Sequence, residues 1–162
     1  MSTTDASTDA STGTPAPGTI DIKLEVITIP VSDVDRAKSF YESLGWRIDA
    51  DFDLGNGIRV VQFTPTHSEC SLAFGSGIVN AEPGSVERLE MVVSDIEAAR
   101  ADLVSRGVEV SEPFHRGAGG FEPGLDPERK SYNTYATFKD PDGNGFLLQE
   151  VTERLPGRVW ED

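Results

Sequence analysis

The sequence predicts an α+β fold, with two tandem βαβββ modules forming a half-barrel cavity. The main observation is that PVSDVDRAKSFYESLG, at residues 30–45, recurs as VVSDIEAARADLVSRG at residues 92–107. Each copy follows one run of β-branched and aliphatic residues and precedes several more, which is typical of strands. A chain of 162 residues can also bury a core of its own.

Each module is expected to begin with a strand and a capped helix. A serine with an acid three residues later is typical of a helix start, because both side chains satisfy free backbone N–H groups. Apolar residues then recur at intervals of three and four, and a glycine that accepts the left-handed conformation ends each helix. The matching parts are 23–31 and 87–93 for the strands, Ser32 and Ser94 for the caps, and Gly45 and Gly107 for the ends.

Three more strands are expected after each helix. The glycine-rich stretch at 115–132 interrupts the second module and predicts a long irregular loop, which would be a lid, a binding loop or a disordered segment. The predicted strands are WRIDADF, IRVVQFTP and CSLAFG in the first module, then VEVSEPF, NTYATFKD and FLLQEV in the second.

The chain is expected to divide into two modules, a linker and two tails. The opening residues are rich in Ser, Thr, Ala, Gly and Pro and offer almost nothing to bury, so disorder is expected there. The predicted boundaries are 1–19 for the disordered tail, 20–76 for the first module, 77–85 for the linker, 86–152 for the second module and 153–162 for the C-terminal tail.

Charge and composition limit the partners and the compartment. The 28 acidic and 14 basic residues give a formal net charge of -14, which repels nucleic acid and anionic membranes. The single cysteine excludes an intramolecular disulfide and fits a reducing compartment. The sequence contains neither a run of about 18 apolar residues nor a secretory leader, so a cytoplasmic location is expected.

The bare face of each sheet is the expected site of function. A helix covers only one face of its module, and the other face must be covered as well. The two bare faces must therefore curl around a shared cavity or pair across chains, and exposed sheet edges favour a homodimer. A mostly apolar cavity with a few polar groups predicts a small molecule as the occupant.

These features resemble the vicinal oxygen chelate superfamily, also called the glyoxalase, bleomycin-resistance and extradiol dioxygenase family. The resemblance is carried by IPVSDVDRAKSFYESLGW, its repeat MVVSDIEAARADLVSRGV, and the closing FKDPDGNGFLLQEV, and it runs from about residue 22 to residue 151. It implies the paired-module fold. It leaves the activity open, because the family contains isomerases, lyases, dioxygenases, epimerases, thiol transferases and proteins that sequester drugs.

The resemblance also implies positions for a divalent metal ion. Catalytic members hold the ion with His, Glu or Gln side chains from the first and last strands of each module. The matching residues here are Val26, Arg88, Leu147 and either Ser71 or Leu72. The first three do not supply the donors that such an ion needs, and neither histidine of the chain stands at a ligand position. We therefore predict no metal or other cofactor. The alternative is a divalent ion bound in a shifted register or by a set that includes Glu90, Gln149 and Glu25.

Alternation with a period of two identifies the residues that share the cavity face. Glu90 and Arg88 are the candidate catalytic residues. A carboxylate in an apolar cavity has a raised pKa and can act as general acid or base, while the arginine holds a substrate carboxylate or an oxyanion. The simpler interpretation, which we favour, is that the two side chains neutralise each other or lie at a wet rim. The candidate substrate-binding residues are Leu24, Val26, Thr28, Val92, Leu147, Gln149 and His115.

The long loop supplies a second group of candidates. His115 would reach over the cavity as an acid–base group, and Arg116, Arg129 and Tyr132 would gate its entrance. The simpler interpretation is that the histidine is exposed and has no role, and that the other three are solvated loop residues.

Three functions follow from these candidates. The first is a glyoxalase-like protein that binds a small organic molecule without a metal and that, if it turns over substrate, catalyses acid–base isomerisation or elimination. The second is a binding protein that sequesters a drug or metabolite, for which the net acidity favours cationic ligands. The third is a metal-dependent lyase or dioxygenase with displaced ligands.

Overall fold

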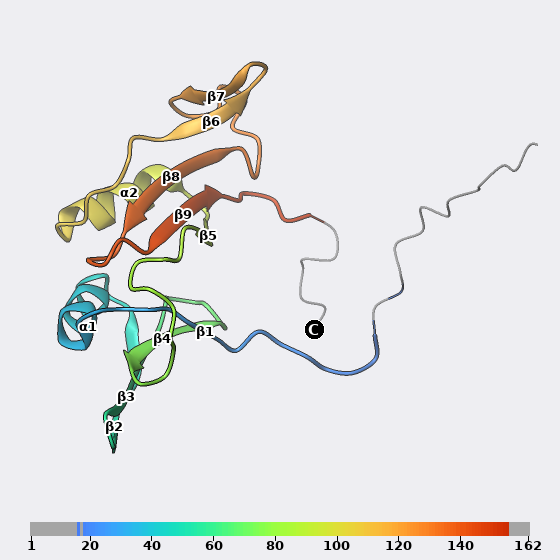
Figure 1. The fold of residues 1–162 in the computed structure, drawn as a ribbon. Helices are drawn as coiled ribbons and strands as arrows, with labels where there is room; N and C mark the ends of the chain where they lie inside the picture. Colours follow the sequence, from blue (N-terminus) through green and yellow to red (C-terminus); the bar gives the residue numbers. More distant parts are fainter. Residues whose placement is uncertain (1–15, 17, 156–162) are drawn as a thin grey trace, which may run out of the picture.

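The first module is a four-stranded sheet with one helix against it (Figure 1). Its elements are β1 (Val26–Thr28), α1 (Val34–Ser43), β2 (Arg47–Gly55), β3 (Ile58–Thr64) and β4 (Ser71–Ser76). The strand order is β1-β4-β3-β2, in which β1 runs parallel to β4 and the other neighbours are antiparallel. The computed structural model describes residues 16 and 18–155, so nearly all of the predicted N-terminal tail lies outside the described residues, as does the C-terminal tail from residue 156.

The second module repeats this plan with one additional strand. Its elements are β5 (Leu89–Val93), α2 (Ile96–Ser105), β6 (Phe114–Gly117), β7 (Gly120–Pro123), β8 (Thr134–Lys139) and β9 (Gly145–Glu150). The strand order is β5-β9-β8-β6-β7, with β5 parallel to β9. The predicted α+β fold with two βαβββ units is confirmed, and neither sheet closes into a barrel. No helix within the described ranges is long and apolar enough to cross a membrane.

The prediction for residues 108–123 is wrong in two respects. VEVSEPF forms no strand before its last residue, because Val108 and Val110 pack against the core from a connecting segment. The strand β6 begins at Phe114 and forms a hairpin with β7, inside the stretch that was predicted to be irregular. Gly120, with a φ of 118°, supplies a backbone conformation that a side chain would disfavour at the start of β7.

The helix caps also differ from the prediction by one residue. Asp33 and Asp95 are the N-cap residues, and their carboxylates accept hydrogen bonds from the backbone N–H groups of Arg36 and Ala98 at 2.9 and 3.0 Å. Ser32 lies one position earlier, and its backbone N–H donates to Asp142 at 3.1 Å instead.

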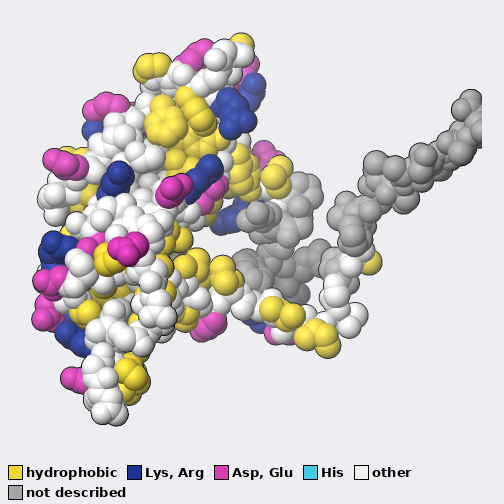
Figure 2. All heavy atoms as spheres, in the orientation of Figure 1, with side chains coloured by type: hydrophobic (Ala, Val, Ile, Leu, Met, Phe, Trp, Pro, Cys, Tyr) yellow, Lys and Arg dark blue, Asp and Glu magenta, His cyan; other side chains and the backbone are white. Residues whose placement is uncertain are grey.

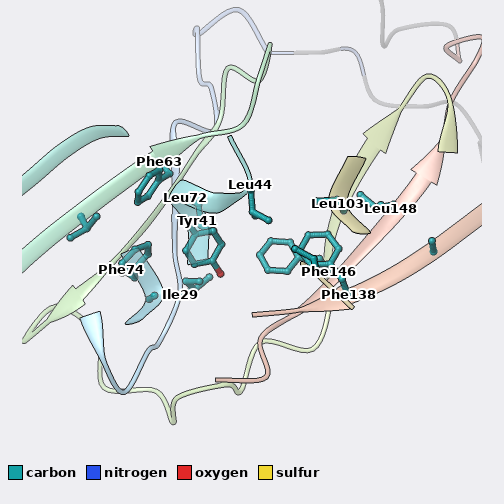
Figure 3. Packing of buried hydrophobic residues seen from close by; sticks show 14 of the residues in the cluster. Ile29, Tyr41, Leu44, Phe63, Leu72, Phe74, Leu103, Phe138, Phe146 and Leu148 are labelled. Atoms are coloured by element: carbon teal, nitrogen blue, oxygen red, sulfur yellow. The ribbon is translucent and has the colours of Figure 1, made fainter. Parts of the chain in front are cut away.

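One hydrophobic core runs through both modules (Figure 3). Tyr41 of α1 lies between the two sheets' cores, with its ring 5.2 Å from Phe74 and 6.2 Å from Phe146. Phe146 in turn stacks on Phe138 at 4.7 Å. The aromatic contacts therefore join the helix of the first module to the last two strands of the second.

The DPDGN turn between β8 and β9 adds further contacts between the two modules. Asp140 accepts a hydrogen bond from the buried Tyr41 hydroxyl at 2.8 Å, and burial together with this carboxylate raises the pKa of Tyr41 far above its usual value. The Asn144 side chain donates to the carbonyl of Pro30 at 2.8 Å. The turn thus holds the modules together, and each sheet keeps the face away from its helix open.

Candidate functional site

The open face of the second sheet carries a groove of about 350 Å³, which we call the aromatic groove. Figure 2 shows hydrophobic side chains gathered over the β6–β8 region with basic side chains beside them. The groove is lined by Glu87, Arg88, Phe114, Arg116, Phe121, Tyr135, Thr137, Phe138, Lys139, Gly145, Phe146 and Leu147.

Strand alternation places the groove residues on one face. Tyr135, Thr137 and Lys139 alternate along β8, so their side chains leave the sheet on the side away from α2. Phe114 of β6 is the register partner of Tyr135, which brings the two rings together. Gly145, at the start of β9, has no room for a side chain, because a Cβ there would overlap the carbonyl oxygen of Glu87.

Three aromatic rings form the apolar wall of the groove. Phe114 and Tyr135 stack with centroids 5.6 Å apart and planes 27° apart. Phe121 of β7 stands perpendicular to both, at 5.5 Å from Phe114 and 5.9 Å from Tyr135. The Phe121 side chain is well exposed, so an aromatic ligand can reach it directly.

Arg116 lies at the β6–β7 end of this wall. Its guanidinium carbon is 5.3 Å from the centre of the Phe121 ring, within the range of a cation–π contact. Lys139 lines the opposite end, at the last residue of β8 and beside Gly145 in the register. The aromatic wall therefore lies between two basic side chains.

The structure places the predicted catalytic pair at an exposed position. Arg88 donates a hydrogen bond to Glu90 at 2.9 Å, and the side chains remain 63% and 42% exposed. The apolar enclosure expected around Glu90 does not form, because the sheet face above β5 is open. The geometry corresponds to the simpler interpretation, in which the two charges neutralise each other at a wet rim.

The predicted substrate-binding residues are divided among three places. Leu147 lies in the aromatic groove, and Val92 is exposed on the same sheet face. Gln149 is buried and donates to the Tyr132 carbonyl at 2.9 Å. Three others lie in or just before β1 of the first module and are Leu24, Val26 and Thr28.

His115 does not reach over the groove. It is buried on the opposite side of β6 from Phe114 and Arg116, with Nδ1 2.8 Å from the carbonyl oxygen of Gly124. Its Nε2 lies 3.5 Å from Glu122. The prediction of an exposed loop histidine is therefore wrong, because this residue belongs to the hairpin.

Two of the predicted gate residues have structural contacts instead. Arg129 binds the buried carboxylate of Glu150 at 2.9 Å, and this contact raises the pKa of the arginine. The Tyr132 carbonyl accepts hydrogen bonds from Gln149 and from the Tyr135 hydroxyl. Only Arg116 of the three lines the groove.

The side chains at the family's metal positions do not fit a divalent ion. Arg88 and Leu147 do meet in the aromatic groove, whereas Val26 lies opposite Ser71 in the other sheet. A guanidinium and aliphatic side chains offer no ligands to a hard cation. Residues 18–155 hold no group of three or more His, Cys, Asp or Glu side chains placed to bind a metal. The alternative set is not assembled either, since Glu25 lines a pocket on the first sheet.

That pocket is larger, about 650 Å³, but more open to solvent and more polar than the aromatic groove. Arg47 binds Asp49 at 2.5 Å, and the Thr64 hydroxyl donates to the same carboxylate. These contacts, the arginine first, lower the pKa of Asp49. Among the described residues the pocket has no aromatic wall, and its arginine is already paired with Asp49, so we regard the aromatic groove as the better candidate site.

Sequence reasoning missed most of the aromatic groove. The alternation of Tyr135, Thr137 and Lys139 in NTYATFKD was a usable signal for one wall. Phe114 and Phe121 were not identified because the hairpin that carries them was predicted to be a loop.

The comparisons with known proteins agree with the fold. The family described as the Glyoxalase/Bleomycin resistance protein/Dioxygenase superfamily matches residues 23–148. The chain belongs to this family. TnmS3, an antibiotic binding protein from Streptomyces sp. CB03234, is 30% identical with a TM-score of 0.63, and the match covers 83% of this chain and 99% of TnmS3.

Two further relatives extend this similarity. A glyoxalase/bleomycin resistance protein from the same Streptomyces strain is 32% identical with a TM-score of 0.59, over 77% of this chain and 97% of that one. The uncharacterised protein YetH of Bacillus subtilis (strain 168) is 24% identical over 130 residues, which is 79% of this chain and 98% of YetH.

Proposed function

We propose that this protein binds a small aromatic molecule in the aromatic groove and sequesters it. The observation that carries the proposal is the wall of Phe114, Phe121 and Tyr135, in which two rings stack and the third stands perpendicular and exposed. Such a wall offers both a face and an edge to a flat ligand.

The dimensions of the groove and the comparisons support this proposal. A volume of about 350 Å³ falls in the range of small-molecule sites, roughly 300–1,000 Å³. TnmS3, which is similar over most of its length, is an antibiotic binding protein. The ion pair of Arg88 with Glu90 supports sequestration over acid–base catalysis, because each side chain already has a partner.

The test is a fluorescence titration with N-phenyl-1-naphthylamine, a neutral aromatic probe that brightens in apolar surroundings. Phe121→Ala should weaken binding about tenfold, since one aromatic contact contributes roughly 0.5–1.5 kcal/mol beyond its buried area. Phe52→Ala is the matched control, because Phe52 is similarly exposed but lies on the first sheet. Equal affinities of both variants would contradict the proposal.

Sequestration and turnover are separated by recovery of the ligand. After long incubation with wild-type protein, the extracted probe should be chemically unchanged by mass spectrometry. We also propose that binding needs no metal ion, so dialysis against EDTA should leave the affinity within about twofold. If dialysis lowered the affinity and added metal ion restored it, the claim that binding needs no metal would be contradicted.

The homodimer expected from the sequence stays a prediction. Exposed apolar side chains on the edge strand β2, Ile48, Phe52 and Leu54, offer a contact surface that would support it. Sedimentation equilibrium should then give twice the chain mass, and a monomer at micromolar concentration would reject the prediction.

A further inference from the structure

We infer that the aromatic groove selects ligands that carry a negative charge, and that Arg116 is the residue that binds the negatively charged group. This inference rests on the proposed function, because it specifies the ligand of the same groove. It also opposes the expectation, drawn from net charge alone, that cationic ligands are preferred.

The first observation is the pairing of basic side chains. In an acidic protein, carboxylates are in excess, and nearly every lysine and arginine of the described residues has one within 4 Å. The exceptions in this part of the chain are Arg116, Lys139 and Arg154. Two of these three line the aromatic groove.

The second observation is the distribution of acids in the groove. Glu90 at the rim is paired with Arg88. Glu87, the carboxylate residue of the groove lining, lies beside Gly145 at the Lys139 end. At the Arg116 end the neighbour in the groove is Phe121, and no carboxylate lines that end among the described residues.

The third observation is the way Arg116 is held. Its guanidinium lies over the Phe121 ring, and its backbone N–H donates to the Asn133 side chain at 3.3 Å. Stacking occupies the face of a guanidinium and leaves its edge N–H groups free for a carboxylate, sulfonate or phenolate. A ligand ring against the aromatic wall would place such a group within reach of that edge.

The overall charge of -14 does not oppose this arrangement at short range. At physiological ionic strength, charges more than about 8 Å apart are largely screened. The contact between Arg116 and the ligand therefore decides the preference, while the distant carboxylates lower only the rate of encounter.

The experiment compares 1-anilinonaphthalene-8-sulfonate with N-phenyl-1-naphthylamine, which has the same rings without the sulfonate. Wild-type protein should bind the sulfonate about tenfold more tightly, the lower end of what a charge-assisted contact contributes. Arg116→Gln should remove this preference, so the substitution should cost the sulfonate about tenfold more affinity than it costs the neutral probe. Arg154→Gln is the matched control, an exposed unpaired arginine outside the groove, and should change neither affinity.

Each outcome bears on one claim. Equal affinities in the wild type, or a preference for the planar cation 9-aminoacridine, would overturn the charge preference and leave aromatic binding standing. An equal loss of both probes in Arg116→Gln would show that the arginine only supports Phe121. Arg116→Lys, which keeps the charge without the planar fork, should retain part of the preference. If neither probe responds to Phe121→Ala, the proposed function itself fails.

Discussion

The open faces of the two modules differ in chemistry although both modules follow one plan. The first face carries a polar pocket in which Arg47, Asp49 and Thr64 satisfy one another. The second carries stacked aromatic rings with the unpaired Arg116 beside them. Each helix packs against the last two strands of its own sheet, so the repeat preserves the fold while the outward positions of each strand determine what can bind.

The largest expected effect comes from exchanging the first residue of the last strand. Ser71 and Gly145 hold this position in β4 and β9, but their neighbours differ: Ser71 donates its N–H to Glu25, whereas Gly145 donates to Val86. The Glu87 carbonyl thereby occupies the space of a Cβ at Gly145. Gly145→Ser should destabilise the protein by up to about 3 kcal/mol, because the backbone must shift.

Urea unfolding at pH 7 measures this effect. The reciprocal Ser71→Gly should lower stability by only about 1 kcal/mol, through loss of the hydroxyl contact with Thr64 at 2.7 Å. Equal losses in the two variants would show that the entry to β9 is not a special feature of the second module.

The next largest effect is on ligand binding. Tyr135 and Val60 correspond, since each lies opposite the fifth residue of the last strand. Tyr135→Val should weaken binding of N-phenyl-1-naphthylamine about tenfold by removing the ring stacked on Phe114. Val60→Tyr, the reverse exchange, should leave the affinity unchanged.

Tyr135→Phe separates the ring from its hydroxyl, which donates to the Tyr132 carbonyl at 2.8 Å. This variant should bind the probe normally and lose about 1 kcal/mol of stability. A binding loss as large as that of Tyr135→Val would assign the effect to the loop conformation and not to stacking.

A smaller effect concerns the pH dependence of stability, which depends on Asp51 in the first sheet. Hydrogen bonds from Arg59 and then Lys38 hold the pKa of Asp51 well below its ordinary value of 3.8. Because the folded-state pKa is depressed, the carboxylate's contribution to stability is fully present above pH 3.8 and is lost as the pH falls through the lower folded value. The stability difference between wild type and Asp51→Asn should therefore shrink below pH 3.8. A difference that stays constant from pH 7 to pH 2.5 would contradict this.

Much of this fold could be predicted because its signals are local. These local signals are the alternation of the strands, the helix caps, which were predicted within one residue, and the glycines Gly45 and Gly107 at the helix ends. Each depends only on a few neighbouring residues. The hairpin carrying Phe114 and Phe121 could not be predicted, because its glycine-rich sequence is typical of a loop. Its strand register is established by pairing with β8, which lies further along the chain. The groove depends on that register.

The smallest expected effect tests the catalytic hypothesis for Glu90. The Arg88–Glu90 pair is exposed on both sides, and exposed pairs contribute roughly 0–1 kcal/mol. Glu90→Gln should therefore leave both stability and N-phenyl-1-naphthylamine affinity nearly unchanged. It also frees Arg88, so affinity for the sulfonate probe should rise slightly, by about twofold at most. Pairing with Glu90 thus neutralises part of the positive charge that Arg88 would otherwise add to the groove. A strong loss of binding, or of any measured turnover, in Glu90→Gln would instead restore this carboxylate as a functional residue.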